Sequence, residues 1–264
     1  MRSIWNGAIS FGLINVPVKM FAATEDKDLH FKLLHKACKA PLKQKRVCSE
    51  CGQEVAWDDT IRAFEWEKGR FVVMEEEDFN VLPETGSRSI DILDFVNLKD
   101  IDPIYFHKTY YLSPGDTGKK AYNLLRSAME DTGKIAVAKV ILREKQHLVT
   151  LRIVEDCIAM AMMFYPDEIR SIEHVPAVHD QITVSEGEKK MAVQLIESLA
   201  EPFDANKYTD TYREELLNVI EAKAHGEQLE VSVAPRAAKV VDLMEALRAS
   251  LELVENQKKK RGVS

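Results

Sequence analysis

Three β-rich runs follow one another almost without a gap, and they constrain the fold more than any other part of this 264-residue sequence. They span residues 135–143, 148–155 and 157–165, and residues 144–147 form the expected turn between the first two. Apolar and β-branched runs that are separated only by short polar turns are typical of consecutive antiparallel strands. Together with an earlier hairpin signal, they predict a sheet that closes into a barrel.

Other local patterns indicate further strands and helices and so help to predict the fold class. Residues 3–23 mix Ile, Phe and Val with Gly and Pro, which favours short, bent strands. Residues 64–74 carry two apolar runs around Lys68-Gly69, a hairpin signal. A helix is expected over residues 116–130, before Gly133. After Ser185, which forms a capping box with Glu188, the pattern is helical. We therefore predict a mixed α+β chain with a β-barrel core and a helical C-terminal arm.

Three regions are expected from these patterns. Residues 1–182 form the barrel core and include a basic loop with Cys and His at 29–51. Residues 183–228 form a helical arm, whose second helix spans about 211–224 and stops before Gly226. Residues 229–264 hold a further helix, which begins near Pro235, and a short basic tail at 258–261 that we expect to be disordered.

Positive charge is concentrated in residues 29–49, although the formal net charge of the chain is −7. This stretch holds six cations and no carboxylate. Uncompensated cations repel one another, which favours phosphate binding over an ordinary solvated surface. No recognition helix and no aromatic-rich RNA signature accompanies them, so we expect contacts to the backbone rather than to base edges. The expected phosphate contacts in this stretch are Lys32, Lys36, Lys39, Lys43, Lys45 and Arg46.

The predicted barrel adds three cations to this set. Lys139 and Arg143 are four positions apart, so the two-residue period of a strand predicts that they share one face. Arg152 on the neighbouring strand can join them. The alternative is that this face is simply solvated.

Four potential metal ligands lie within the basic loop. His35, Cys38, Cys48 and Cys51 have the spacing H-x2-C-x9-C-x2-C, and such pairs bend readily around one tetrahedral Zn²⁺. Four protein ligands would leave no open position, so the zinc would be structural. The alternatives are a redox-active Cys-x2-Cys pair and core residues without metal. Cys157 lies in an apolar strand and is expected to be a buried small side chain.

No pattern commits the chain to catalysis, and we predict that it is not an enzyme. The segment from Gly115 to Lys120 lacks the spacing of a phosphate-binding loop and is expected to start a helix. The carboxylates at Asp100 and Asp102, and at residues 75–78, are expected to be acidic turns. No apolar run is long enough to span a membrane, and the N-terminus is a poor signal peptide. We therefore expect a cytoplasmic protein.

The last predicted helix carries an apolar seam. Val240, Met244, Leu247, Leu251 and Val254 step by 4, 3, 4 and 3 residues. This spacing is typical of a helix that packs on another helix.

Several segments resemble the bacterial Ku family, which binds DNA ends in non-homologous end joining. Residues 2–21, RSIWNGAISFGLINVPVKMF, are similar to the opening of that family. The similarity continues through the Cys/His loop, the 64–74 hairpin and the strands from Ile135 to the segment 164–170, FYPDEIR. It extends to Tyr208-x-Asp210-x-Tyr212 and to residues 241–247, VDLMEAL, and so covers nearly the whole chain.

The resemblance implies function and partners. It implies a ring-shaped homodimer that holds double-stranded DNA by its end without reading bases, with the helical arm as the dimerisation region. It also implies recruitment of a multifunctional ATP-dependent DNA ligase in DNA repair, through the helix that begins near Pro235. On that helix the residues expected to contact the partner are Val240, Leu243, Met244, Leu247 and Leu251.

Two rival functions remain open from the sequence. One is a zinc-stabilised adaptor whose basic loop meets an acidic protein. The other is enzymatic, either a carboxylate nuclease or a lyase in which a lysine forms a Schiff base with an abasic DNA end.

Overall fold

The computed structural model of the chain describes residues 1–80, 88–178, 180, 182–226 and 243–261. These residues form two compact units, Met1–Ile172 and Glu173–Ser264. The boundary between them lies ten residues before the one expected at residue 182. In the described part of the chain, no helix has the length and apolar content that crossing a membrane requires.

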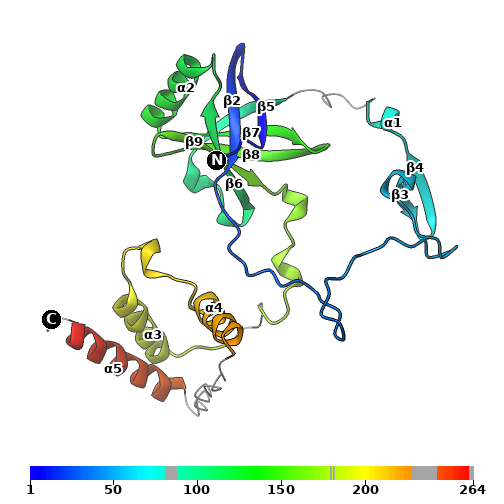
Figure 1. Cartoon of the computed structure of the whole chain (residues 1–264). Coiled ribbons are helices and arrows are strands. Elements are labelled where there is room, and N and C mark those ends of the chain that lie inside the picture. The colour runs from blue at the N-terminus through cyan, green and yellow to red at the C-terminus, as the bar shows by residue number, and fades with distance from the viewer. Residues whose placement is uncertain (81–87, 179, 181, 227–242, 262–264) are drawn as a thin grey trace. The chain divides into compact units, whose positions relative to one another are not determined.

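Seven strands of the first unit close into a barrel, as the sequence predicts. Their order is β1-β2-β6-β9-β8-β7-β5, and a parallel pairing of β1 with β5 completes the circle. In Figure 1 the N-terminal strands (blue) accordingly lie beside much later ones (green). The strands are β1 (Trp5–Phe11), β2 (Ile14–Ala22), β5 (Ser89–Val96), β6 (Phe106–Pro114), β7 (Ile135–Leu142), β8 (Lys145–Val154) and β9 (Cys157–Met163).

The turn between β7 and β8 differs from the expectation. The polar run 144–147 was expected to form it, but the turn is only Arg143-Glu144. Lys145 pairs with Leu142, and His147 pairs with Val140, so the ladder continues through these polar residues. Pairing with a neighbouring strand has therefore outweighed local polarity.

The barrel interior is an aliphatic core. Along β7, Ala136, Ala138 and Val140 point inward and are buried, while the residues between them are partly exposed. Full burial of one aliphatic side chain stabilises a fold by about 1.5–3 kcal/mol. The largest fully buried apolar side chains are Ile9, Val16, Val18, Ile90, Leu112, Val140, Val149, Leu151, Ile158 and Met160.

Helix α2 (Lys119–Thr132) packs on this barrel through buried Tyr122, Leu125 and Met129. The Tyr122 hydroxyl donates to the Leu112 carbonyl at 2.6 Å and accepts from the Ile158 amide at 2.8 Å. Burial raises the pKa of Tyr122 well above its ordinary value, so the hydroxyl keeps its proton. This one group therefore ties the helix to β6 and β9.

The glycines before α2 serve packing. The Gly115 amide donates to the Pro17 carbonyl at 2.7 Å, and a Cβ at Gly115 would lie 2.9 Å from the Pro17 side chain. A Cβ at Gly118 would meet the Pro17 carbonyl oxygen at 2.8 Å. The prediction that this segment starts a helix is confirmed.

Residues 24–79 connect β2 to the later strands and contain no buried residue among those described. They include the expected hairpin of β3 (Arg62–Glu67) and β4 (Arg70–Met74), which turns at Lys68-Gly69, and the short helix α1 (Glu76–Asn80). Gly69 has a φ of 79°, the left-handed conformation that glycine adopts most easily. This segment therefore has no hydrophobic core of its own.

The second unit is helical, as predicted. Helix α3 (Glu186–Leu199) begins with the expected capping box, in which the Ser185 hydroxyl accepts from the Glu188 amide. Helix α4 (Thr211–Ala224) ends before Gly226, and α5 (Leu243–Arg261) packs against α3. The predicted start of α5 near Pro235 lies outside the described residues.

The backbone of α5 continues through residues 258–261, so the expectation of a disordered tail there is wrong.

Candidate nucleic-acid interface

The Cys/His loop contains the same tight turn twice. In the first turn the Lys39 amide donates to the His35 carbonyl at 2.8 Å, and in the second the Gly52 amide donates to the Cys48 carbonyl at 2.9 Å. Lys39 and Gly52 both have left-handed φ angles, 56° and 70°. An isolated antiparallel β-bridge flanks each turn. Leu34 pairs with Pro41 around the first turn, and Val47 pairs with Glu54 around the second.

Each turn brings two of the predicted metal ligands together. The His35 Nδ1 lies 3.0 Å from the Cys38 Sγ. In the second turn, hydrogen bonds from the backbone of Cys51 and then of Glu50 lower the pKa of Cys48, which favours its thiolate form. Donor type and backbone geometry suit metal binding at each turn. However, no group of three or more potential ligands lies together in the described part of the chain, so the four predicted ligands are placed as two pairs.

The six cations of residues 29–49 are all exposed. Lys45 forms an ion pair with Glu54 at 2.6 Å, and the Arg46 guanidinium lies 4.4 Å from the centre of the Trp57 ring. The other four, Lys32, Lys36, Lys39 and Lys43, have no ion pair among the described residues.

Sequence reasoning missed the roles of Glu54 and Trp57, because both lie beyond the end of the basic stretch. The bridge between Val47 and Glu54 brings that carboxylate back beside Lys45. An exposed ion pair of this kind stabilises a fold by about 0–1 kcal/mol. Lys45 is therefore held near Glu54 but only weakly.

The three predicted barrel cations do not form one surface. Lys139 is partly exposed between the buried Ala138 and Val140, and its cross-strand neighbour is Asp91. Arg152 is partly exposed on β8. Strand β7 ends at Leu142, so the strand period does not extend to Arg143.

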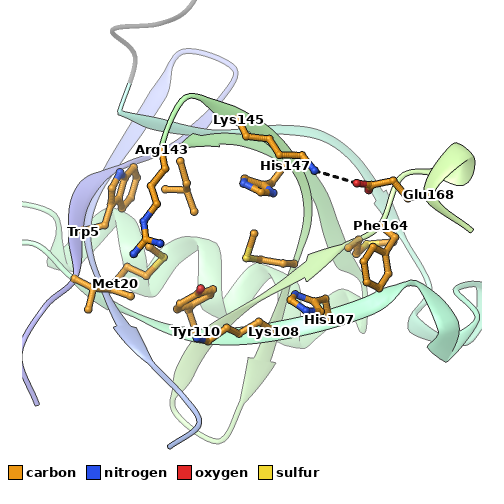
Figure 2. A pocket seen from close by; sticks show the side chains of 14 residues that line it. Trp5, Met20, His107, Lys108, Tyr110, Arg143, Lys145, His147, Phe164 and Glu168 are labelled. Atoms are coloured by element: carbon orange, nitrogen blue, oxygen red, sulfur yellow. Dashed lines mark hydrogen bonds and ion pairs between the residues drawn. The ribbon is translucent and has the colours of Figure 1, made fainter. Parts of the chain in front are cut away.

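Figure 2 shows that the Arg143 side chain instead extends into the mouth of the barrel. The prediction that Lys139 and Arg143 share a face is therefore wrong.

The backbone at this turn is strained. Arg143 and Glu144 have φ angles of 51° and 63°, which only glycine and, less often, asparagine or aspartate adopt easily. Holding a non-glycine residue in such a region costs about 1–3 kcal/mol. Outside the mouth, the Glu144 carboxylate accepts from the Arg62 guanidinium at 2.8 Å.

The predicted partner-binding seam is partly covered within the chain. Met244, Leu247 and Leu251 are half-buried on α5, which packs against α3. The prediction that this seam packs on another helix is confirmed. Leu243 is exposed, and Val240 lies outside the described residues.

The close carboxylates at Asp78, Asp100 and Asp102 lie in turns, as the sequence predicts. Asp102 accepts from the Ile104 amide, Asp100 accepts from the Asn97 side chain, and Asp78 accepts from the Glu75 amide. Each of these hydrogen bonds joins residues two or three positions apart and lies within its own turn.

Comparison with known proteins agrees with the barrel and its attached loop. A family model described as "Ku70/Ku80 beta-barrel domain" matches residues 10–191. A protein of Heliobacterium modesticaldum named "Non-homologous end joining protein Ku" is 51% identical, over 98% of this chain and 95% of its own length. The protein of the same name from Bacillus subtilis is 44% identical, over 96% of this chain and 82% of its own length.

A third relative is less similar but matches over its whole length. The "Non-homologous end joining protein Ku" of Archaeoglobus fulgidus is 37% identical, over 97% of this chain and 100% of its own length. The matches therefore include the helical second unit as well as the barrel. This chain belongs to the Ku family.

Proposed function

We propose that this chain acts as a homodimer that binds the ends of double-stranded DNA, independently of sequence, in non-homologous end joining. The observation that carries the proposal is the match to relatives named for that process over at least 96% of the chain. The exposed cations of the 29–49 stretch supply the chemistry, because phosphate contacts provide most of the sequence-independent affinity for DNA.

The proposed DNA surface consists of the basic stretch and the outer face of the barrel. Lys and Arg that contact phosphates position a duplex without reading its sequence. Arg143 is left out of this surface, because its side chain extends into the barrel mouth. The residues proposed to contact phosphates are Lys32, Lys36, Lys39, Lys43, Arg46, Lys139 and Arg152, together with Lys45 when its ion pair with Glu54 is broken.

Uncovered apolar side chains of the second unit support a homodimer. Ile196 and Leu199 at the end of α3 are 68% and 60% exposed, Phe203 is 82% exposed, and Tyr208 and Tyr212 before and in α4 are 71% and 73% exposed. Phe203 and Tyr208 stack with ring centroids 5.8 Å apart, and exposed apolar side chains that cluster in this way mark interaction sites. A second copy of the arm would cover them and would bring two basic loops to one duplex.

We further propose that a structural Zn²⁺ joins the two turns of the Cys/His loop. His35 and Cys38 would hold the ion from one side, and Cys48 and Cys51 from the other. This segment has no buried residue, so a metal would supply the order that a hydrophobic core supplies elsewhere.

The C-terminal helix is proposed to recruit an ATP-dependent DNA ligase. Leu243 and Leu253 are 58% and 63% exposed and are free to meet a partner. Met244, Leu247 and Leu251 would take part only where the partner competes with α3.

A comparison of linear and covalently closed circular DNA tests the proposed function. A ring that threads onto DNA needs a free end, so the protein should shift a linear duplex but not a closed circle of the same sequence. Cutting the circle once should restore binding. Equal binding to both forms would indicate a generic basic patch and would refute loading at ends.

A further inference from the structure

The mouth of the barrel is a second candidate binding site. It is a cavity of about 590 Å³ between the start of β1, the bulged part of β6 and the turn that joins β7 to β8 (Figure 2). Pockets for small ligands commonly have volumes of about 300–1,000 Å³. From its lining we infer that the mouth binds a nucleoside phosphate, either a free nucleotide or the unpaired last nucleotide of a DNA strand.

Positive charge in the mouth is not fully neutralised. Lys145 is paired with Glu168 at 3.0 Å, and a hydrogen bond from the Tyr165 backbone also lowers the pKa of Glu168. Lys108 and Arg143 have no ion pair among the described residues. Two free cations therefore face one cavity in a chain of net charge −7, which favours an anionic ligand.

Two backbone irregularities bring these cations to the mouth. The pairing of β6 with β9 shifts between Phe106 and Thr109, so His107 and Lys108 together oppose a single residue. Bulges of this kind redirect side chains and are frequent beside functional sites. The second irregularity is the left-handed turn at Arg143.

Aromatic side chains complete the walls. In Figure 2 the Arg143 side chain lies beside Trp5 and extends towards Tyr110, and His147 lies between them and Glu168. Lys108 Nζ lies 5.7 Å from the centre of the Tyr110 ring. Aromatic faces stack on bases of any sequence, while the two cations can hold a phosphate. Together these groups match a nucleoside phosphate better than a plain phosphate or a plain base.

The first experiment titrates the full-length protein calorimetrically with dATP, deoxyadenosine and tripolyphosphate. Only dATP carries both base and phosphate, so it should bind most tightly. Arg143→Ala or Lys108→Ala should each weaken dATP binding by about tenfold or more, because a hydrogen bond to a charged group contributes about 1.5–3 kcal/mol. Lys120→Ala removes one exposed cation elsewhere on the same unit and should leave binding unchanged.

A glycine variant separates a binding role from a structural one. Arg143→Gly removes the side chain and also relieves the positive φ, so it should raise the melting temperature while weakening dATP binding. Tripolyphosphate binding as tight as dATP binding, or equal losses in Arg143→Ala and Lys120→Ala, would overturn the inference.

The second experiment separates the two sources of the nucleotide and rests on the proposed DNA-end function. Duplexes with a single-stranded overhang should bind more tightly than blunt duplexes, and Arg143→Ala should abolish that difference while blunt-end binding persists. dATP binding without an overhang preference identifies a free nucleotide as the ligand. If the protein neither binds dATP nor prefers overhangs, the proposed site in the barrel mouth is refuted. Blunt-end binding that persists in that case would leave the proposed DNA-end function intact.

Discussion

Replacing Glu54 with Gln tests whether the basic stretch contacts DNA. The substitution removes the carboxylate that pairs with Lys45 at 2.6 Å and leaves a side chain of the same shape. Because Lys45 and Glu54 are both exposed, with 65% and 57% of their side chains accessible, the unfolding midpoint should barely change. DNA binding should change more, because Lys45 becomes available to a phosphate.

The expected size of the change follows from counterion release. Each phosphate contact contributes about −0.9 to the slope of log K against log salt for duplex DNA. With Lys45 held by Glu54, the other five cations of the stretch give about −4.5 for each protomer, and release of Lys45 takes this to about −5.4. A homodimer should therefore show a slope steeper by about 2 in the variant.

Fluorescence anisotropy with a labelled blunt duplex, measured across a salt series, gives these slopes. Glu67→Gln is the matched control, because it releases Arg70 from an exposed ion pair of 2.8 Å on the β3–β4 hairpin, outside the proposed DNA surface. The control should keep the wild-type slope. Identical slopes for wild type and Glu54→Gln, or the same steepening in the control, would show that the stretch does not contact phosphates.

Three further predictions concern other parts of the account. Reversing the charges of Lys43, Lys45 and Arg46 to Glu should weaken binding to all duplex sequences alike in gel-shift assays, and sequence-selective loss would contradict backbone-only contacts. Tyr122→Phe removes the hydrogen bonds to the Leu112 carbonyl and the Ile158 amide and should lower the free energy of unfolding by about 2 kcal/mol in denaturant titrations; an unchanged midpoint would contradict this. Alkylation of the apo-protein at Cys48 should have a pH midpoint below that of a free thiol, and one equivalent of Zn²⁺ should suppress it; alkylation at the same rate with zinc would argue against the metal site.

Much of the fold was accessible from the sequence because its signals are local. The hairpin at Lys68-Gly69 and the capping box at Ser185 and Glu188 each depend on a few neighbouring residues, and both were placed correctly. The barrel followed from β-rich runs with short turns. The order in which β1, β2 and β5 join the later strands was not accessible, since it depends on pairings across most of the barrel unit.

The positions of the DNA-binding and barrel-mouth residues were harder to predict from the sequence, because the direction of a side chain on a strand depends on the pairing register. The sequence places Lys139 and Arg143 on one face only if β7 runs through both, and the turn begins one residue earlier than that requires. The carboxylate beside Lys45 is nine residues away in sequence and reaches it through a bridge. The bulge at His107 and Lys108 appears only when β6 is paired with β9.

For the metal ligands, too, the local arrangement could be predicted from the sequence and the long-range arrangement could not. Spacing correctly indicates which residues share a turn, His35 with Cys38 and Cys48 with Cys51, because each pair is enclosed by its own local hydrogen bonds. Whether the two turns meet around one ion depends on a contact between them that neither local pattern specifies.

The most direct test asks whether two copies of the protein hold one DNA end. Analytical sedimentation gives the mass of the free protein and the mass of its complex with a short blunt duplex. The proposed function predicts a dimer in solution and two protomers on a duplex just long enough for one assembly. A monomer that binds the duplex singly, at concentrations where binding is saturated, would contradict it.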